Sequence, residues 1–516
     1  MADIIFTSIT TPVGIDCEDL AKCSSSEHIY SHLEYEQDVF GARAQLDHYP
    51  LDLIASNIRA SSVVLHWPTM KQLLAEIRCE KPLYVAMQVT APTFERAENM
   101  TRKIKELFPE VKVIYGGYAP EKGSADELFL GEGVSRFREF LGEEQREITH
   151  PLMILKYGVL NIPLGTGSGV ILANVGCGNK CDFCATSHYH NGKKTALLNG
   201  EEVNSLVSKY VEAGLSEITM FNEDHLEDKV RNESFHKHVK ELKKLINITC
   251  FGTTKSVRQY KPEELFDLGY HIWAGFEDFS SMYSKNNYDE IKDFVETMHA
   301  HGILLIASSF IGDPKQTLQD CKTTIDRMIE LAPYTMQMNI KTPFPGTPFH
   351  EKVHITDKRY KNYEGNHLVF EHPTITKEQM EALQLQAQKR DYFELGPSII
   401  RALAISFKGY KTFKNSGVPR IRQRVEQNSN TLRRALPLID LAINRHPNPE
   451  VKDKIRQLRG DIISAIGKPS FYIPQRILVN CLGMYESARI SLERRIPALM
   501  RQPKFKRNTY ENGVIV

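Results

Sequence analysis

The chain has 516 residues, and its 65 Lys and Arg nearly balance its 64 Asp and Glu, which leaves a formal net charge of +1. This length exceeds one ordinary hydrophobic core and predicts two to four domains. A hydrophobic content of 41% and a charged content of 25% are typical of globular proteins and exclude large disordered regions. The longest apolar run, residues 303–312, is too short to span a bilayer.

The sequence also indicates a cytoplasmic protein. Its first residues, Met1 to Phe6, lack the basic region of a signal peptide. Its nine cysteines are odd in number and scattered, except for one trio. This distribution is typical of a reducing compartment rather than of a disulfide framework.

Residues 1–150 are predicted to form a doubly wound, Rossmann-like α/β domain. A charged helix is expected over residues 93–108, and the candidate strands are 83–89, 111–115 and 127–130. Short apolar strands that alternate with helices predict a parallel sheet. The last two of these strands end in glycine-rich turns, and glycines at such strand ends let a ligand approach the backbone closely.

Residues 165–375 repeat the alternation of strand and helix. The candidate strands are 169–173, 217–221, 246–251, 271–275, 302–308 and 335–340. Six strand–helix units predict a partial (β/α)6 barrel rather than a complete barrel of eight units. Functional groups in such folds lie at the carboxyl ends of the strands.

Residues 376–516 are predicted to be mainly helical and are strongly basic. The candidate helices are 377–394, 401–413, 431–443 and 451–466. Residues 401–516 contain 23 Lys and Arg but 8 Asp and Glu, a net charge of +15. This charge favours an anionic partner such as a phosphate-bearing lipid, a membrane surface or RNA. The alternative is that the basic segment docks on the acidic remainder of the chain.

Cys177, Cys181 and Cys184 form the pattern C-x3-C-x2-C directly after the strand predicted at 169–173. Cysteine thiolates are the usual ligands of iron–sulfur clusters. A structural zinc site normally has four ligands and paired two-residue spacings, which this segment lacks. Three thiolates on a four-iron cluster leave one iron open. The alternatives are a chance grouping, or a zinc site completed by His188 or His190.

With Phe183 before its last cysteine, this pattern resembles the signature of the radical S-adenosylmethionine (radical SAM) enzymes. The resemblance implies that the three cysteines hold a 4Fe–4S cluster. It also implies that the open iron binds the amino and carboxylate groups of S-adenosylmethionine, which is cleaved to a 5′-deoxyadenosyl radical. An external electron donor such as flavodoxin or ferredoxin would then be needed.

Further segments resemble that family in the expected order along the chain. Glu223 and Asp224, after the second barrel strand, are candidates for binding the amino group of S-adenosylmethionine, although the family's two glycines are absent there. Glu277, after the fourth strand, suits the ribose hydroxyls. Ile311 and Gly312, after the fifth, resemble the segment that packs on adenine. Residues 342–348 resemble a proline-rich turn of relatives that carry an amino-terminal cobalamin domain.

The amino-terminal section resembles that cobalamin-binding domain through its glycine turns. The resemblance implies that the glycines line a corrin pocket: Gly116, Gly117, Gly131 and Gly133. The Asp-x-His-x-x-Gly motif, which supplies a histidine ligand to cobalt in other cobalamin proteins, is absent. A degenerate domain without cobalamin is therefore the alternative, and His66 and Trp67 are interpreted as structural residues.

The sequence thus predicts a radical SAM enzyme that modifies an unactivated carbon by cobalamin-assisted methylation, cyclisation or C–C coupling. Its charge distribution favours a small-molecule or lipid substrate, such as an isoprenoid with an anionic group, and peripheral membrane contact through the basic region. One alternative is a tRNA methylthiotransferase, which would need a second cysteine trio, and the cysteines left for it are Cys17, Cys23 and Cys79. The other is a non-catalytic metal-binding module for nucleic acid. A nucleic-acid partner is not expected.

Overall fold

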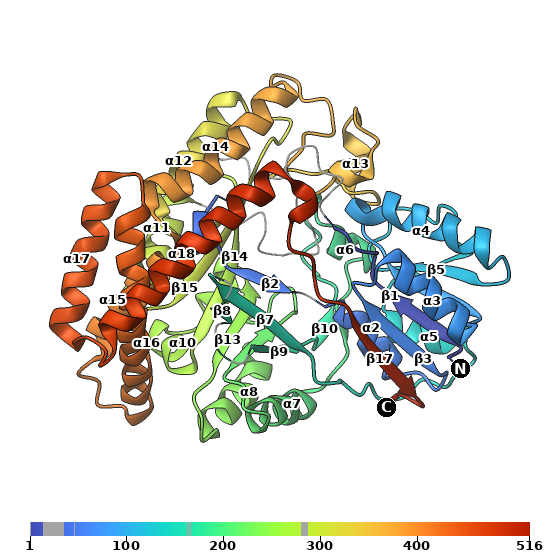
Figure 1. Ribbon diagram of the computed structural model, residues 1–516, viewed down its shortest axis with the longest axis horizontal. Helices are drawn as coiled ribbons and strands as arrows, with labels where there is room; N and C mark the ends of the chain where they lie inside the picture. The colour runs from blue at the N-terminus through green and yellow to red at the C-terminus, as the bar shows by residue number, and fades with distance from the viewer. Residues whose placement is uncertain are drawn as a thin grey trace.

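A computed structural model describes residues 2–13, 36–45, 47–160, 162, 163, 165, 167–279 and 287–516. The amino-terminal sheet with its helices lies at one end of the molecule, the curled second sheet in the middle, and the carboxyl-terminal helices at the other end (Figure 1). This arrangement confirms the predicted α/β fold with a helical carboxyl-terminal region.

The amino-terminal sheet is doubly wound. Its parallel strands run in the order β3 (Ser62–His66), β1 (Ile4–Thr7), β4 (Tyr84–Gln88), β5 (Lys112–Gly116) and β6 (Glu127–Leu128). Ile4 and Phe6 pack on one face with α2 (Tyr49–Ala55) and α5 (Gly133–Phe140). Ile5 packs on the other face with α3 (Met70–Glu80) and α4 (Phe94–Leu107). The strand order reverses between β1 and β4, which is where open α/β sheets bind ligands at their carboxyl edge.

The end of the chain returns to this sheet, which the sequence did not predict. Strand β17 (Lys506–Glu511) pairs antiparallel with β3, and β18 (Val514–Ile515) pairs with β17 at the sheet edge. Asn508 and the hydroxyl of Tyr510 donate to one oxygen of Asp52 at 2.9 and 2.8 Å. Residues 506–511 therefore belong to the amino-terminal sheet and not to the helical region.

The middle section confirms the predicted partial barrel. Its six parallel strands are β9 (Ser168–Ile171), β12 (Glu217–Met220), β13 (Asn247–Gly252), β14 (Tyr270–Glu277), β15 (Leu304–Ile311) and β16 (Thr335–Ile340). The connecting helices include α7 (Gly200–Glu212), α8 (Lys229–Glu241), α10 (Pro262–Leu268), α11 (Tyr288–Ala300) and α12 (Leu318–Leu331). Two antiparallel strands, β7 (Ile154–Val159) and β2 (Arg43–Gln45), extend the sheet beyond β9.

The carboxyl-terminal region contains five long helices. They are α14 (Lys377–Leu395), α15 (Ser398–Phe413), α16 (Pro419–Arg445), α17 (Pro449–Ile466) and α18 (Tyr472–Arg495). The apolar side chains of Ala402, Leu403 and Phe407 on α15 are buried, so they pack the helix on its neighbours. Within the described part of the chain, none of the helices combines the length and apolar character that a bilayer crossing requires.

Much of the basic charge of this region docks on the rest of the protein. Arg424 is buried and donates to Asn247 and to the carbonyl of Ile246 at 2.8 and 2.9 Å. Arg401, the first residue of the basic segment, is also buried and lies 2.8 Å from Asp391. Arg401 is therefore a structural residue.

We expect the Asp391–Arg401 pair to contribute strongly to stability. Replacing Asp391 with Ala leaves the Arg401 guanidinium buried without its counter-charge, which typically costs about 3–5 kcal/mol. The free energy of unfolding from urea titration measures this loss.

Asp326→Ala is the matched control, because the Asp326 side chain is 60% exposed and pairs with Arg390 at 2.6 Å on the surface. It should cost at most about 1 kcal/mol. Equal losses in the two variants would contradict a special role for the buried pair.

Candidate functional site

The three cysteines lie on one loop at the carboxyl edge of the barrel sheet. The loop follows β9 and β10 (Asn174–Val175) and ends at Cys184, the N-cap of α6 (Ala185–Tyr189). Ser187 on α6 fixes its shape, because the Ser187 hydroxyl accepts from the amide of Lys180 at 3.0 Å and donates to the carbonyl of Cys177 at 2.9 Å. Cys177, Cys181 and Cys184 are all partly exposed, so their thiols are within reach of an added group.

A buried lysine holds the same loop from beneath. Lys341 follows β16, and its ammonium lies 2.8 Å from Asp313 and 3.5 Å from Asp182, which sits between the last two cysteines. The ammonium also lies 5.4 Å from the ring centroid of Phe183 and 4.2 Å from that of Phe349. Ion pairs and cation–π contacts of a desolvated ammonium are strong. Phe183, part of the sequence signature, therefore anchors the loop to the ends of neighbouring strands.

The donor set of the loop fits an iron–sulfur cluster. Burial raises the pKa of the Cys177 and Cys184 thiols, and the negative charge of Glu223 raises both further. Metal coordination supplies the positive charge that converts such thiols to thiolates. The nearby histidines are engaged elsewhere: His188 Nε2 lies 3.0 Å from the carbonyl of Cys181, and the His190 ring packs against Tyr118. Among the described residues, no group of three His, Cys, Asp or Glu is arranged for a single metal ion.

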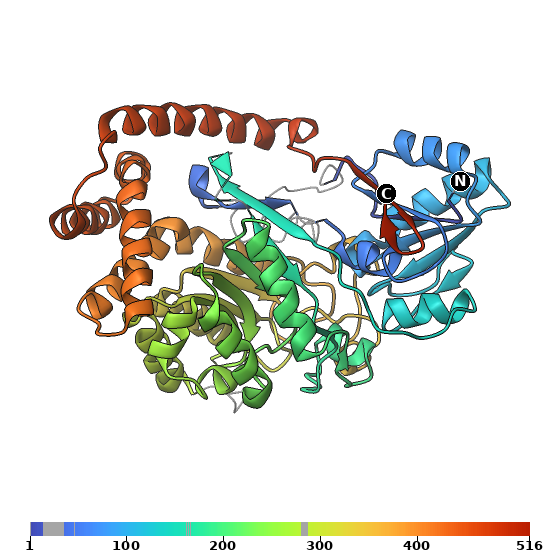
Figure 2. The same cartoon turned by 90° about the horizontal axis from the view of Figure 1, so that it is seen from below.

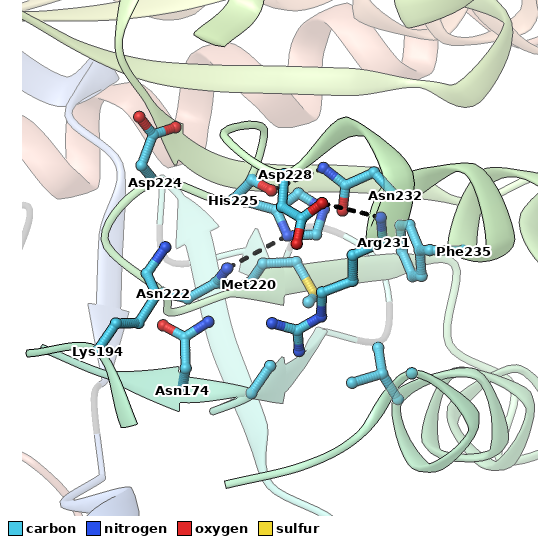
Figure 3. Close-up of a pocket in the computed structure, with 13 residues that line it drawn as sticks. Asn174, Lys194, Met220, Asn222, Asp224, His225, Asp228, Arg231, Asn232 and Phe235 are labelled. Carbon is cyan, nitrogen blue, oxygen red and sulfur yellow. Dashed lines mark hydrogen bonds between the residues drawn. The ribbon is translucent and has the colours of Figure 1, made fainter. Parts of the chain in front are cut away.

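A pocket lies next to this loop, between the carboxyl ends of β9 and β12 and the first turns of α7 and α8 (Figure 3). Its lining residues are Ala173, Asn174, Lys194, Gly200, Val203, Met220, Asn222, Asp224, His225, Asp228, Arg231, Asn232 and Phe235. Three of them, Asn174, Asn222 and Asp224, each have a buried Oδ1 atom without a hydrogen-bond partner in the described structure. Buried acceptors of this kind favour a ligand that donates hydrogen bonds.

The two acidic candidates after β12 have different surroundings. Asp224 is buried, its Oδ2 accepts from the hydroxyl of Thr253 at 3.0 Å, and burial raises the pKa of its carboxyl. Glu223 is exposed, and its charge acts on two of the three cysteines. Their assignment to the amino group of S-adenosylmethionine stays a prediction, and their place beside the loop is compatible with it.

Glu277 ends β14 in a left-handed backbone conformation. Its φ is 57°, and the register of β14 against β15 shifts between Gly275 and Glu277. The Ser309 hydroxyl donates to the carbonyl of Glu277 and so fixes the bulge. Left-handed residues other than glycine are uncommon and concentrate at functional sites. The bulge lies at the carboxyl edge of the sheet and places the half-buried Glu277 there. The predicted contact with ribose would lie at this edge.

Ile311 and Gly312 lie in a more closed setting than the sequence suggested. Ile311 is fully buried, and a Cβ added at Gly312 would lie 3.3 Å from Met380 Sδ of α14. Gly312 is needed for its φ of 87°. Neither residue presents an open surface in this structure, and their contact with adenine stays a prediction.

The four glycines of the amino-terminal sheet divide into two kinds. An added Cβ meets nothing within 4 Å at Gly116 or Gly131, so space is open above both strand ends. At Gly117 it would lie 2.9 Å from the carbonyl oxygen of Val89, and at Gly133 it would lie 2.7 Å from Ile54 Cδ1. Gly116 and Gly131 therefore leave room for close approach of a ligand, whereas Gly117 and Gly133 have close neighbours; the φ of 89° at Gly131 also favours glycine.

The carboxyl edges of the two sheets meet at α6. The Tyr189 hydroxyl donates to the carbonyl of Phe129 at 3.0 Å, just before Gly131. The Tyr118 ring, just after Gly117, lies 4.8 Å from the Tyr189 ring. Because Cys184 is the N-cap of α6, these contacts bring the cysteine loop and the glycine turns to one place.

Sequence analysis missed two residues of this region. Lys341 gave no signal, because a single lysine before a proline-rich turn does not indicate burial. His48 lies beside β4, where its Nδ1 is 3.1 Å from Gln88 Oε1 and its buried Nε2 has no hydrogen-bond partner in the described structure. His66 pairs with Asp52 at 2.8 Å, in agreement with its interpretation as a structural residue.

Residues 171–328 match the family described as the Radical SAM superfamily. An uncharacterized methyltransferase of Pyrococcus horikoshii is 24% identical over 326 residues, which are 54% of this chain and 71% of that protein. Among solved structures, TsrM from Kitasatospora setae, a radical S-adenosylmethionine methyltransferase with cobalamin and a [4Fe–4S] cluster bound, has a TM-score of 0.47 and 12% identity. That match covers 68% of this chain and 75% of TsrM. The cobalamin-dependent S-adenosylmethionine radical enzyme OxsB has a TM-score of 0.45 and 13% identity, over 84% of this chain and 75% of OxsB.

Replacing any one of Cys177, Cys181 and Cys184 with Ser should abolish stable cluster binding, because a hydroxyl is a poor iron ligand. Iron and sulfide analysis after anaerobic reconstitution should give roughly four irons per chain for the native protein and few for each variant. Cys481→Ser, at an exposed cysteine of α18, is the control and should keep its iron. Retention of iron by the triad variants would contradict the assignment.

Lys341→Met should lower the iron content after reconstitution by about half or more, because the loop loses its ionic anchor and buried Asp313 loses its partner. The matched control is Lys352→Met, whose ammonium is 65% exposed and lies 3.9 Å from the same Asp182. Equal iron contents in the two variants would show that Lys341 does not position the loop.

Proposed function

We propose that this chain uses S-adenosylmethionine and cobalamin to methylate an unactivated carbon, because residues 171–328 match the Radical SAM superfamily. The observation that carries the proposal is the meeting of the cysteine loop with the glycine turns of the other sheet at α6. The relative from Pyrococcus horikoshii is described as a methyltransferase, which favours methylation over cyclisation or coupling.

The barrel residues have distinct roles in this proposal. When bound, a reduced 4Fe–4S cluster supplies the electron that cleaves S-adenosylmethionine to a 5′-deoxyadenosyl radical. Cys177, Cys181 and Cys184 hold the cluster through their thiolates. Asp224 and Glu223 offer carboxylates to the amino group of S-adenosylmethionine. Glu277 offers an acceptor to the hydroxyls of its ribose.

The amino-terminal sheet is the proposed cobalamin site. The reversal of strand order between β1 and β4 marks the ligand edge of a doubly wound sheet. The open space at Gly116 and Gly131 lies on this edge. The aromatic contacts of Tyr189 hold the edge against the cysteine loop, so a methyl donor there would lie close to the radical source.

The substrate is proposed to be an apolar molecule with an anionic group, such as a lipid or isoprenoid. The basic character of residues 401–516 supports the anionic group. The electron would come from an external donor such as flavodoxin or ferredoxin. The protein is proposed to work in the cytoplasm, in contact with a membrane surface.

The tRNA methylthiotransferase alternative has little support in the described residues. Of the three cysteines left for its second cluster, Cys17 and Cys23 lie outside the described residues. Cys79 is exposed in the last turn of α3, which leads from the carboxyl end of β3 back toward the amino end of β4. Cys79 therefore lies at the edge of the sheet opposite to the cysteine loop.

The function is tested by reconstituting the full chain without oxygen, adding S-adenosylmethionine, cobalamin and a reductant, and analysing the products. Methylation predicts both 5′-deoxyadenosine and S-adenosylhomocysteine. 5′-Deoxyadenosine alone would contradict methylation and indicate a rearrangement or coupling. The absence of both from iron-loaded protein would contradict radical chemistry.

Gly116→Val should prevent cobalamin binding and leave the cluster intact. Valine suits the end of β5, and a Cβ added there meets no heavy atom within 4 Å, so the side chain should extend into the space proposed for the corrin. Each protein is mixed with cobalamin, desalted and measured by its visible absorbance. The absorbance of bound cobalamin should be at least about tenfold lower for the variant than for the native protein, and the iron content should be unchanged.

Gly460→Val, at an equally open glycine of α17, is the control and should bind cobalamin as the native protein does. Normal cobalamin binding by the Gly116 variant would place the corrin elsewhere.

A further inference from the structure

Helix α18 turns its acidic residues inward. The Glu486 side chain is 3% exposed and lies 3.0 Å from Arg501 and 3.5 Å from Arg489. The Glu493 side chain is 9% exposed and lies 2.6 Å from Arg489. Gly483, on the same face, allows close packing, because an added Cβ would lie 2.8 Å from Leu441 of α16. Both glutamates of α18 are therefore on its buried side, together with the apolar Tyr472, Val479 and Ile490, which pack on the core.

The outward side of α18 is apolar. Ile473, Ile477 and Met484 are 69%, 60% and 64% exposed, at spacings that place them on one helix face. The same exposed surface, here called the α18 face, comprises Phe471, Ile473, Ile477, Leu478, Cys481, Met484, Tyr485, Leu492, Ile496 and Leu499. Single exposed apolar residues are normal, but a continuous stripe marks an interaction site.

The α18 face lies at the outer edge of the molecule. Figure 2 shows α18 as a long bar along one border, with the rest of the protein on its other side. Figure 1 shows the same helix crossing in front of the sheets. The two views agree that the helix lies at the border of the molecule.

The exposed charges of α18 are positive. Arg476 lies near its start, and Arg494 and Arg495 lie at its end. Lys468 is exposed just before the helix, and its ammonium lies 5.5 Å from the ring centroid of Tyr472. Because Glu486 and Glu493 are buried, the exposed charges beside the apolar stripe are cationic, and the half-exposed Arg476 also lies 3.6 Å from the buried Asp440 of α16.

We propose that the α18 face docks on an anionic lipid bilayer, with the helix lying in the plane of the membrane surface. Amphipathic helices with one apolar face and flanking arginines bind in this way, with the apolar side chains at the boundary of headgroups and acyl chains. Arg476, Arg494 and Arg495 extend from that depth to lipid phosphates. Helix α18 is not suited to crossing a bilayer, because its inner face carries two glutamates.

Charge disfavours a second copy of this chain as the occupant of the α18 face. Arginines stand at both ends of the helix. Pairing of two α18 helices across their apolar faces, in either direction, therefore places arginines of one copy beside arginines of the other. Anionic headgroups instead supply the opposite charge at both ends.

This docking does not depend on the radical chemistry, although it would bring a lipid substrate to the protein. The test is flotation of the full chain with vesicles of equal parts phosphatidylglycerol and phosphatidylcholine. The native protein should float with the vesicles. The Ile477→Glu/Met484→Glu double variant should bind at least about tenfold less, because two charged side chains replace apolar ones in the interface.

Val230→Glu is the matched control, since Val230 of α8 is 79% exposed outside the α18 face. It should float like the native protein, and all three proteins should unfold at the same temperature. Failure of the native protein to float, or equal flotation of the double variant, would overturn the proposal. The proposal would also be overturned if the native protein formed a dimer in sedimentation equilibrium, did not bind the vesicles, and lost the dimer in the double variant. Flotation without methylation would overturn the proposed function alone.

Discussion

The contact between the carboxyl edges of the two parallel sheets is the constraint from which the site follows. Ligand-binding loops in parallel α/β folds gather at this edge, and the chain places two such edges against each other. Helix α6 joins them, because Cys184 caps its start and it ends at Tyr189, whose hydroxyl donates to the carbonyl of Phe129. A group held by the cysteines and a group held over Gly116 and Gly131 would therefore be neighbours.

The residues around this contact show how the loop is kept in place before any cofactor binds. Ser187 closes the loop from α6, and Lys341 fixes it from β16 through Asp182 and the ring of Phe183. A lysine buried among carboxylates and aromatic rings is costly to place unless every partner is present. The charge on Lys341 thus links the end of the barrel sheet to the ligand loop, and the sheet supplies a rigid base for chemistry that needs fixed distances.

The sequence could predict most of the fold but only part of the site. The barrel strand predicted at 217–221 is β12 (Glu217–Met220) in the structure. It could be predicted because a short apolar segment lies between two helical, charged segments. Strand β17 was missed because its residues, Lys506 to Glu511, are mostly polar, as suits an edge strand. Helix α18 was missed because its apolar residues lie both on its inner side, as Val479 and Ile490 do, and on its outer side, as Ile477 does, which blurs the helical period. The left-handed turn at Glu277 and the burial of Ile311 depend on tertiary packing, which no local pattern reports.

The central claim is that three cysteines hold one four-iron cluster whose remaining iron is open to S-adenosylmethionine. Electron paramagnetic resonance of the reduced, reconstituted full chain tests it most directly. The account predicts a 4Fe–4S signal that changes when S-adenosylmethionine is added, because the added ligand binds the open iron. A signal that S-adenosylmethionine leaves unchanged, or protein that takes up zinc and no iron, would contradict it.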